Sequence, residues 1–290
     1  MTEGCGVRRT VERMPSPRTA APARLLALLL TLLVVVTACS DSDASPTPDA
    51  GSDAGPAAPD ATANDAPVPT RTYVSLGDSY VAAPLVPTTD MTTGCLRSDH
   101  NYPNLVVDAV PDFALTDVSC SGATSTSMIG VQVTGDTQQL PQFEALDPGT
   151  DLVTLGVGGN DFEVFSSLLV TCLQAAGQDP EGAPCRQAQD GGRTLLRQIA
   201  KIEGRVEAIT TGIKDRAPNA QVVVVNYPQL LPATGTCPDR IPLAAGDYAY
   251  VRTINEALSA AVATGGKAGG AEVVDLFAAS EGHDICAAEP

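Results

Sequence analysis

The sequence predicts a mostly parallel α/β fold in which a five-stranded sheet is covered by helices on both faces. Short apolar runs recur along the chain, segments with helical periodicity separate them, and the runs lack a strict alternation of apolar and polar residues. Continuous apolar runs are typical of strands that are buried on both faces, as in a parallel sheet. In chain order, the predicted strands are residues 73–76, 114–118, 152–155, 221–226 and 272–277.

Each predicted strand has a local justification. The first and third runs are short and apolar, and each is followed at once by a glycine-rich turn. The second run continues the apolar alternation of residues 113–115. Four consecutive valines, residues 222–225, form the fourth run and suit a strand that is covered on both sides. Residues 272–277 are the last apolar run and complete the predicted sheet.

Two amphipathic segments lie between these strands and predict helices over residues 194–216 and 247–263. In the first, apolar residues recur at steps of three and four: Leu195, Ile199, Ile202, Val206, Ile209 and Ile213. In the second, the apolar stripe is Val251, Ile254, Leu258 and Val262. We expect the charges on the other face of the first helix, including Arg205, to be solvated, and they indicate no binding site. Strands and helices in alternation predict a three-layer α/β/α sandwich with right-handed crossovers.

Polar side chains follow three of the predicted strands. Gly77-Asp78-Ser79-Tyr80 comes after the first strand, and Gly158-Gly159-Asn160-Asp161 comes after the third. Gly122 follows the second, in a polar segment of residues 119–124. The carboxyl edge of an open α/β sheet is where ligands bind, so we expect Ser79, Gly122 and Asn160 to meet there. A serine on such a turn has an exposed hydroxyl, as a nucleophile requires.

In these three blocks the chain resembles the SGNH hydrolases, also called GDSL esterases and lipases, over about residues 71–286. The resemblance implies the SGNH hydrolase fold, whose sheet is flavodoxin-like, and a serine esterase or lipase that works through an acyl-enzyme. It assigns the nucleophile to Ser79 and the oxyanion hole to the Ser79 and Gly122 N–H groups and the Asn160 side chain. Each such donor contributes roughly 3 to 4 kcal/mol in similar sites. We expect Asp78 and Asp161 to hold their turns through hydrogen bonds to nearby backbone N–H groups.

The general base is the open question of the sequence, which contains two histidines. We interpret His100 as a loop histidine, whereas His283 follows the last strand and returns to the edge that carries Ser79. The family's last block normally has an aspartate three residues before the histidine; here Ser280 stands there, and its carbonyl could orient His283. Many relatives carry a further histidine, followed by Pro-Asn, near the end of the chain. The alternative is therefore that the base lies beyond Pro290 and that His283 is a structural or substrate-lining residue next to Cys286.

The cysteines predict an extracytoplasmic protein. Six of the eight lie in the globular region and none forms a Cys-x-x-Cys pair, which favours disulfides over a zinc site. Six cysteines allow many pairings. The resemblance to the secreted actinobacterial-type branch of the family, which has three disulfides, favours Cys95–Cys120, Cys172–Cys185 and Cys237–Cys286.

The amino-terminal segment predicts export in three parts. Residues 1–39 have an arginine-rich start and an uncharged apolar run over 25–38, as in a signal peptide. The run ends at Cys39 in a pattern that resembles a bacterial lipobox, so we expect lipidation of Cys39; an ordinary secretory signal is the alternative. Residues 40–70 are rich in Ala, Pro and Asp and predict a disordered linker. The hydrolase domain then covers 71–290, and its carboxyl terminus could be truncated.

Composition limits the partners. The formal net charge of −17 disfavours nucleic acid, which is bound by basic surfaces. No nucleotide-binding glycine motif and no cluster of metal ligands stands in the sequence, so we expect no cofactor and no metal. The expected partners are a small-molecule or lipid acyl ester and, through the lipid anchor, the outer face of the cell membrane, with a monomeric domain. The alternative function is a lipid-anchored binding protein that keeps the fold without turnover.

Overall fold

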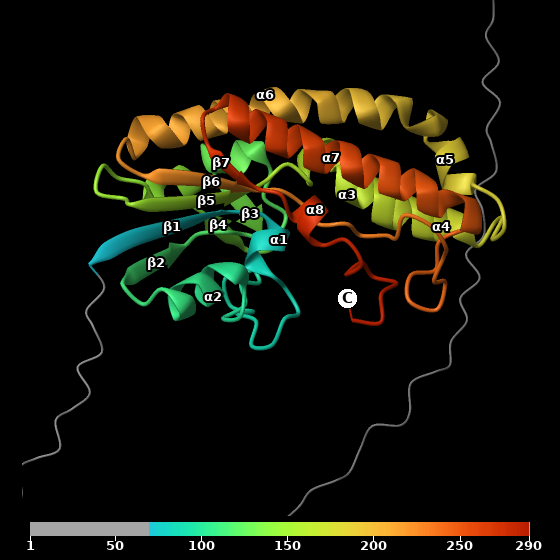
Figure 1. Ribbon diagram of the computed structural model, residues 1–290, viewed down its shortest axis with the longest axis horizontal. Coiled ribbons are helices and arrows are strands. Elements are labelled where there is room, and N and C mark those ends of the chain that lie inside the picture. Colours follow the sequence, from blue (N-terminus) through green and yellow to red (C-terminus); the bar gives the residue numbers. More distant parts are fainter. Residues whose placement is uncertain (1–69, 290) are drawn as a thin grey trace, which may run out of the picture. The chain divides into compact units, whose positions relative to one another are not determined.

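The computed structural model describes residues 70–289, in which a five-stranded sheet has helices on both sides (Figure 1). The sheet has the order β2-β1-β5-β6-β7, and every neighbouring pair is parallel. Counted along the chain, this is the flavodoxin-like order 2-1-3-4-5, as predicted. The strands are β1 (Arg71–Gly77), β2 (Phe113–Asp117), β5 (Leu152–Gly156), β6 (Gln221–Val225) and β7 (Glu272–Val274).

Two long helices cover one face of the sheet, and a shorter helix lies on the other. α6 (Arg193–Arg216) and α7 (Tyr248–Ala268) run side by side above the sheet in Figure 1, and α2 (Tyr102–Ala109) lies below it. The apolar stripes predicted for the two long helices are buried in the core against the sheet. The three-layer α/β/α sandwich is therefore confirmed.

The remaining elements are short. They are α1 (Ser79–Ala82), α3 (Val164–Ser166), α4 (Cys172–Ala176), α5 (Pro184–Ala188), α8 (Leu276–Ala279) and the antiparallel hairpin of β3 (Gln132–Thr134) and β4 (Thr137–Gln139). A π-helical turn, Ser167–Thr171, joins α3 to α4. Single 3₁₀ turns cover Ser125–Met128, Gln142–Ala145, Asp161–Glu163, Asp190–Gly192 and Ala245–Asp247. The periodicity of the sequence did not reveal these pieces because none is long enough to show a repeat.

The last strand is shorter than predicted. The strand expected over 272–277 ends at Val274, and α8 begins at Leu276. Asp275 caps this helix, since its Oδ1 accepts a hydrogen bond from Ala278 N at 3.2 Å. Asn226, expected inside the fourth strand, lies just beyond it and holds the same turn: its Nδ2 donates to Asp275 Oδ1 at 2.9 Å, and its Oδ1 accepts from Leu276 N at 2.6 Å. Polar side chains thus end both strands.

α7 continues past its predicted end at residue 263 because two glycines let it pack closely. A Cβ atom on Gly265 would lie 2.3 Å from the carbonyl oxygen of Glu203 in α6. One on Gly266 would lie 2.8 Å from Val224 of β6. The absence of these side chains brings the end of α7 against both α6 and the sheet, and this packing outweighs the low helix propensity of glycine.

The three expected disulfides are present. Cys95–Cys120 joins two loops on the carboxyl side of the sheet, Cys172–Cys185 joins α4 to α5, and Cys237–Cys286 ties the loop after β6 to the last described segment. The predicted leader of residues 1–39, with Cys39, and the linker before Thr70 lie outside the described residues. Within 70–289, no helix is both long enough and apolar enough to cross a membrane.

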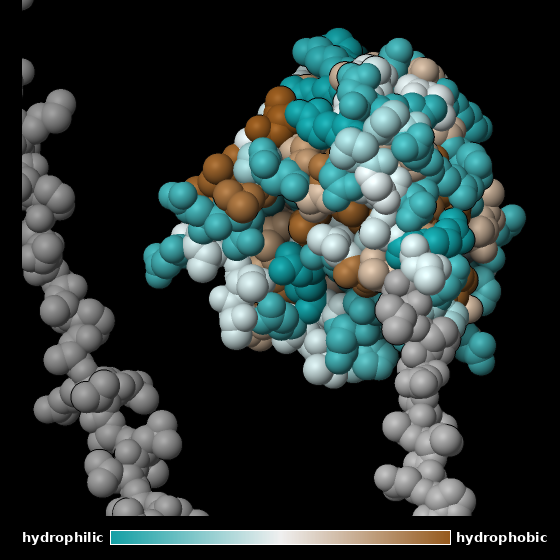
Figure 2. Space-filling view, turned by 90° about the vertical axis from the view of Figure 1, so that its left-hand side faces the viewer, coloured by the Kyte–Doolittle hydropathy of each residue, from teal (hydrophilic) through white to brown (hydrophobic). Residues whose placement is uncertain are grey.

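The surface is predominantly hydrophilic where the strands of the sheet begin. Figure 2 shows this side of the molecule, on which polar side chains predominate and apolar ones form small, separate groups. This agrees with the excess of acidic residues in the sequence.

Candidate active site

The turns that carry Ser79 and Asn160 leave neighbouring strands at the same level. Gly77 at the end of β1 is paired with Gly156 at the end of β5, and Asp78 N donates to Gly156 O at 3.0 Å. From β1 the chain moves outward to β2 and then returns to β5 on the other side, so the strand order reverses between β1 and β5. Such a reversal leaves a crevice at the carboxyl edge of the sheet. Ser79, the first residue of α1, is half-buried there.

The segment that contains Gly122 is hydrogen-bonded to both turns. Cys120 N donates to Gly77 O at 3.0 Å, and Asn160 Nδ2 donates to Ala123 O at 2.9 Å. Gly122 has a φ of +80°, a left-handed conformation that favours glycine. Among residues 70–289, no group accepts a hydrogen bond from Gly122 N or from the second Nδ2 hydrogen of Asn160. Both donors therefore remain free for a ligand.

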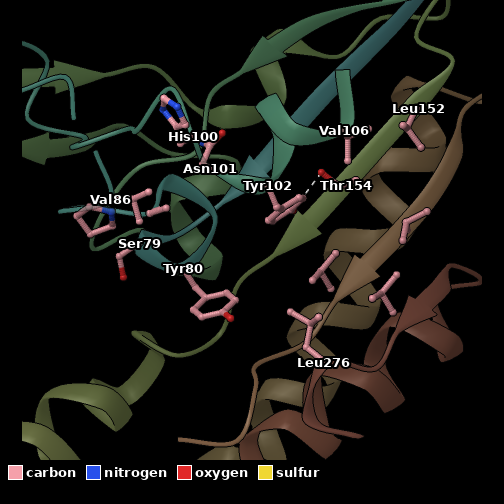
Figure 3. A pocket seen from close by; sticks show the side chains of 15 residues that line it. Ser79, Tyr80, Val86, His100, Asn101, Tyr102, Val106, Leu152, Thr154 and Leu276 are labelled. Atoms are coloured by element: carbon pink, nitrogen blue, oxygen red, sulfur yellow. Dashed lines mark hydrogen bonds between the residues drawn. The ribbon is translucent and has the colours of Figure 1, made fainter. Parts of the chain in front are cut away.

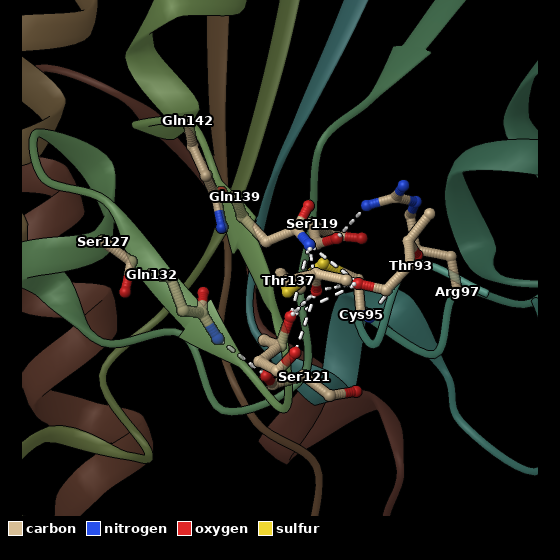
Figure 4. The surroundings of a disulfide bond; sticks show 12 residues. Thr93, Cys95, Arg97, Ser119, Ser121, Ser127, Gln132, Thr137, Gln139 and Gln142 are labelled. Atoms are coloured by element: carbon tan, nitrogen blue, oxygen red, sulfur yellow. Dashed lines mark hydrogen bonds between the residues drawn. A yellow bond between two sulfur atoms is a disulfide. The ribbon is translucent and has the colours of Figure 1, made fainter. Parts of the chain in front are cut away.

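A disulfide and several polar contacts support the Gly122 segment. Figure 4 shows the Cys95–Cys120 bond with Ser121 and Gln132 beside it. Gln132 Nε2, from the β3–β4 hairpin, donates to Ser121 O at 2.8 Å. Arg97 Nη1 donates to the neighbouring carbonyl oxygen of Ser119 at 2.8 Å. The segment is thus held on both sides of Gly122 by residues from other parts of the chain.

Asp78 is buried beneath the Ser79 turn and holds it. Its Oδ1 accepts a hydrogen bond from Tyr80 N at 2.9 Å, which is the backbone contact expected from the sequence. Its Oδ2 accepts from the Tyr227 hydroxyl at 2.5 Å. Burial raises the pKa of Asp78 from 3.8 to about 6, although both hydrogen bonds oppose this shift.

Replacing Asp78 by asparagine is expected to remove a pH-dependent part of the free energy of unfolding. Since the pKa is higher in the folded state, the folded protein holds the proton more tightly, and wild-type stability falls as the pH rises from 3.8 to about 6. This loss amounts to about 2 kcal/mol between about pH 4 and about pH 7. Urea unfolding at both pH values measures it. The free-energy difference between variant and wild type should shift by that amount in favour of the variant at the higher pH; an unchanged difference contradicts the prediction.

Asp161 does not bond to its own turn in the way that Asp78 does. Its two carboxylate oxygens accept from Ser125 N at 2.9 Å and from Ser125 Oγ at 2.6 Å, and Arg205 Nη1 also donates to it. The expected backbone N–H partner is thus present, but it belongs to Ser125, 36 positions away, and not to the turn of Asp161 itself. Phe162, which follows it, has a φ of 55° and lies against the Arg205 guanidinium at 4.1 Å from the ring centroid.

Arg205 corrects a second expectation. We expected it on the solvated face of its helix, but its guanidinium reaches the fully buried Asp161 carboxylate. A buried carboxylate needs a charged partner, and α6 passes close enough to supply one. Asp161 and Arg205 thereby link the Asn160 turn, the segment after Gly122 and the helical layer.

Neither histidine lies at hydrogen-bonding distance from Ser79. His283 is exposed, and its Nδ1 lies 3.1 Å from the carbonyl oxygen of Glu289. The Ser280 carbonyl accepts a hydrogen bond from the backbone N–H of His283 and not from its ring, contrary to the orienting role expected for it. His100 is also exposed and pairs through Nδ1 with Asp99. The role of His283 as base remains a prediction.

A cavity of about 850 Å³ opens beside Ser79 and runs along the face of the sheet opposite α6 and α7 (Figure 3). Ser79 and Tyr80 lie at one end, and Val106 and Leu152 lie at the other. Most of its lining is apolar: Ala83, Pro84, Val86, Val106, Leu152, Val223, Val225, Val274 and Leu276. His100 belongs to the lining, and His283 does not.

Two further lining residues, Tyr102 and Thr154, carry hydroxyl groups that the sequence did not suggest, and Tyr73 lies behind them. Tyr102 Oη donates to Thr154 Oγ1 at 3.1 Å, and Thr154 in turn lies 2.9 Å from Tyr73 Oη. Burial raises the pKa of Tyr73 to about 12, so this phenol keeps its proton. Among residues 70–289, no group of three or more His, Cys, Asp or Glu side chains is placed to hold a metal ion.

Tyr227 is the residue of this site that the sequence reasoning missed. It follows β6, and its hydroxyl contacts both Asp78 and Gly159. The signal was available, since Asn226 ends the fourth predicted strand and Tyr227 directly follows it, so both lie at the edge that carries Ser79. Arg205 offered no comparable signal, because its spacing is that of any charged residue on an exposed helix face.

Comparison with known proteins identifies the family of the chain. The model of the GDSL-like lipase/acylhydrolase family matches residues 75–290. Lipase 2 of Streptomyces coelicolor is 38% identical over 237 residues, which cover 79% of this chain and 78% of the relative.

Two solved structures have the same fold. The phospholipase A1 from Streptomyces albidoflavus NA297 shares 27% identity with a TM-score of 0.62, covering 74% of this chain and 84% of that one. The extracellular lipase from Streptomyces rimosus also shares 27% identity with a TM-score of 0.62, and the match covers 76% of this chain and 86% of that one. With a family model matched over most of its length and relatives that share both its sequence and its fold, the chain belongs to the GDSL-like lipase/acylhydrolase family and is a carboxylic ester hydrolase.

Proposed function

We propose that the protein hydrolyses carboxylic esters through an acyl-enzyme formed on Ser79. The observation that carries this proposal is the position of Ser79: at the crevice between β1 and β5, at one end of an apolar cavity, next to two turns with unused hydrogen-bond donors. A nucleophile, an apolar binding region and preorganised donors are the parts that acyl transfer requires.

The proposed reaction has two halves. Ser79 Oγ attacks the ester carbonyl while a general base takes its proton, and the tetrahedral intermediate then expels the alcohol, which receives that proton. Water attacks the acyl-enzyme in the second half and releases the acid. The negative oxygen of each intermediate would accept hydrogen bonds from Ser79 N, Gly122 N and the free Nδ2 hydrogen of Asn160. These bonds are stronger in the transition state than with bound ester, so they raise kcat.

The cavity supports a substrate with an apolar acyl chain. Its lining between Ser79 and Leu152 is mainly aliphatic, and burial of each CH₂ group contributes about 0.8 kcal/mol. We place the acyl chain there and the alcohol on the solvent side of Ser79. The names of the relatives, a phospholipase A1 and an extracellular lipase, support lipid esters and action outside the cell. Lipidation of Cys39 and attachment to the membrane belong to the proposal, as does a monomeric domain.

The experiment that tests the proposal is turnover of p-nitrophenyl esters combined with labelling by a fluorophosphonate probe. The wild-type protein should hydrolyse the esters, and the probe should modify the tryptic peptide that contains Ser79. Binding of fatty acyl ligands without turnover would support a non-catalytic binding protein instead. Labelling of a different serine would contradict the assignment of the nucleophile.

The prediction that His283 is the general base has a test of its own. Loss of a general base typically lowers the rate by about 10² to 10⁴-fold, so His283→Ala should lower kcat by that range with folding unchanged. The fall of kcat at low pH, which reflects protonation of the base, should be absent in this variant. A His283→Ala variant with the full wild-type rate would exclude this role and leave His283 as a contact of Glu289.

A further inference from the structure

Tyr227 lies between the turn that carries Ser79 and the turn that carries Asn160. Its side chain is almost fully buried, and it does not line the cavity. Its ring packs edge-on against two aromatic side chains, Tyr80 at a centroid distance of 5.9 Å and Phe165 at 5.1 Å. Tyr80 follows the nucleophile, whereas Phe165 belongs to the helix that follows the Asn160 turn. The ring therefore packs against the turn that carries Ser79 and against the helix that follows the Asn160 turn.

The Tyr227 hydroxyl joins the same two turns by hydrogen bonds. Gly159 N–H can only donate, so the hydroxyl oxygen accepts from it at 2.7 Å. The hydroxyl hydrogen is then donated to Asp78 Oδ2 at 2.5 Å. Burial and the neighbouring Asp78 charge raise the pKa of Tyr227 well above its ordinary value, so the phenol keeps this hydrogen. One oxygen atom thus links a residue adjacent to Ser79 with a residue adjacent to Asn160.

The Asn160 turn approaches this hydroxyl closely because it has a glycine at position 159. A Cβ atom on Gly159 would lie 1.9 Å from the Phe165 ring and 3.0 Å from Tyr227 Oη. Only glycine leaves room for both the ring and the hydroxyl at this position. On the other side of Tyr227, Ser259 of α7 donates to the Tyr227 carbonyl oxygen at 2.8 Å, which fixes the backbone of the tyrosine.

We propose that Tyr227 is a positioning residue that sets the separation between the Ser79 nucleophile and the Asn160 donor by bridging Asp78 and Gly159. This inference rests on the proposed function of Ser79 and Asn160. Without the bridge, the two turns remain linked only at the strand ends, by Asp78 N to Gly156 O, and indirectly through the Gly122 segment. The Asn160 amide is then held less firmly at its distance from the oxyanion. A misplacement of about 1 Å can cost about 10²-fold in rate.

The test begins with Tyr227→Phe in the full chain, which keeps the ring and removes only the hydroxyl. We expect kcat for p-nitrophenyl butyrate to fall by about 10 to 10²-fold, with KM changed by less than about threefold, because the donors act mainly in the transition state. Titration with a fluorophosphonate counts the competent sites, so that kcat refers to folded enzyme only. A purely structural role would lower the number of competent sites and leave kcat per site unchanged.

Tyr250→Phe is the matched control. Tyr250 is also buried and also donates its hydroxyl to a side-chain oxygen, Gln189 Oε1 at 2.6 Å, but it lies on α7 outside the site. Its kcat per site should remain within about twofold of wild type.

A double-mutant cycle identifies the bond through which Tyr227 acts. In Asp78→Asn the carboxylate oxygen that accepts from Tyr227 is replaced by an amide nitrogen, which cannot accept. If the bridge is the cause, the double variant should lose about as much kcat as the more impaired single variant. Losses that multiply, or a Tyr227→Phe enzyme with wild-type kcat, would overturn the inference. The proposed function is judged separately, by whether wild-type turnover exists and depends on Ser79.

Discussion

Replacing Ser79 by alanine is expected to lower kcat/KM for p-nitrophenyl butyrate by on the order of 10⁵-fold, as loss of the nucleophile does in serine hydrolases. The hydroxyl is the only atom removed, and Ala82 and Ala83 keep their backbone hydrogen bonds to the Ser79 turn. The fold should therefore survive, with a melting temperature close to that of the wild type. Steady-state hydrolysis and thermal unfolding of the purified variant measure both quantities.

Ser166→Ala is a suitable control for this prediction. Ser166 is exposed on α3, and its hydroxyl donates only to Glu163 O at 3.1 Å, so the rate of this variant should stay within about twofold of wild type. Substantial ester hydrolysis by Ser79→Ala would contradict the assignment. The activity would then have to come from another group on the protein or from a contaminant, and the fluorophosphonate label would reveal which serine reacts.

Replacing Asn160 by alanine should give the second largest effect, a fall in kcat of about 10² to 10³-fold with little change in KM. The variant would lack the amide hydrogen that we assign to the oxyanion. The variant would also lack the hydrogen bond to Ala123 O, which in the wild type orients the amide towards the Gly122 segment. Kinetics with a series of p-nitrophenyl esters separate kcat from KM.

Asn219→Ala controls for the loss of an ordinary amide contact. Asn219 Nδ2 also donates to a backbone carbonyl, that of Pro148 at 3.2 Å, but it precedes β6 at the opposite end of the sheet from Ser79. This variant should keep the wild-type kcat. If Asn160→Ala raised KM and left kcat unchanged, Asn160 would be a substrate-binding residue, and the proposed oxyanion hole would lack its side-chain donor.

The sequence predicted the sheet and its two long helices because buried strands and amphipathic helices are repeated local patterns. The runs at 152–155 and 221–226 and the apolar stripe of α6 fall where the structure has them, apart from the ends of the elements. The ends of the strands and helices were predicted less accurately because they depend on capping contacts. Asn226 stops one strand and caps the next turn through Asp275, a residue 49 positions away in the chain.

The site was predicted only as far as local motifs reach. Ser79 and Asn160 stand in recognisable turns, whereas Tyr227 and Arg205 act on those turns through bonds that span 149 and 44 positions of sequence. No spacing rule connects residues that far apart, because the fold alone brings them together. The rule that polar residues after parallel strands meet at one edge applied equally to the strand before Tyr227, and it would have identified this residue.

The bond between Cys95 and Cys120 closes a covalent ring of chain whose two ends are 25 positions apart, immediately before Gly122. Cross-linking a loop of this length reduces the conformational entropy of the unfolded chain by an amount worth about 3.5 kcal/mol. The same bond ties Cys120, two residues before Gly122, to the loop of Cys95 before any ester binds. Substrate binding energy does not have to organise this part of the catalytic centre.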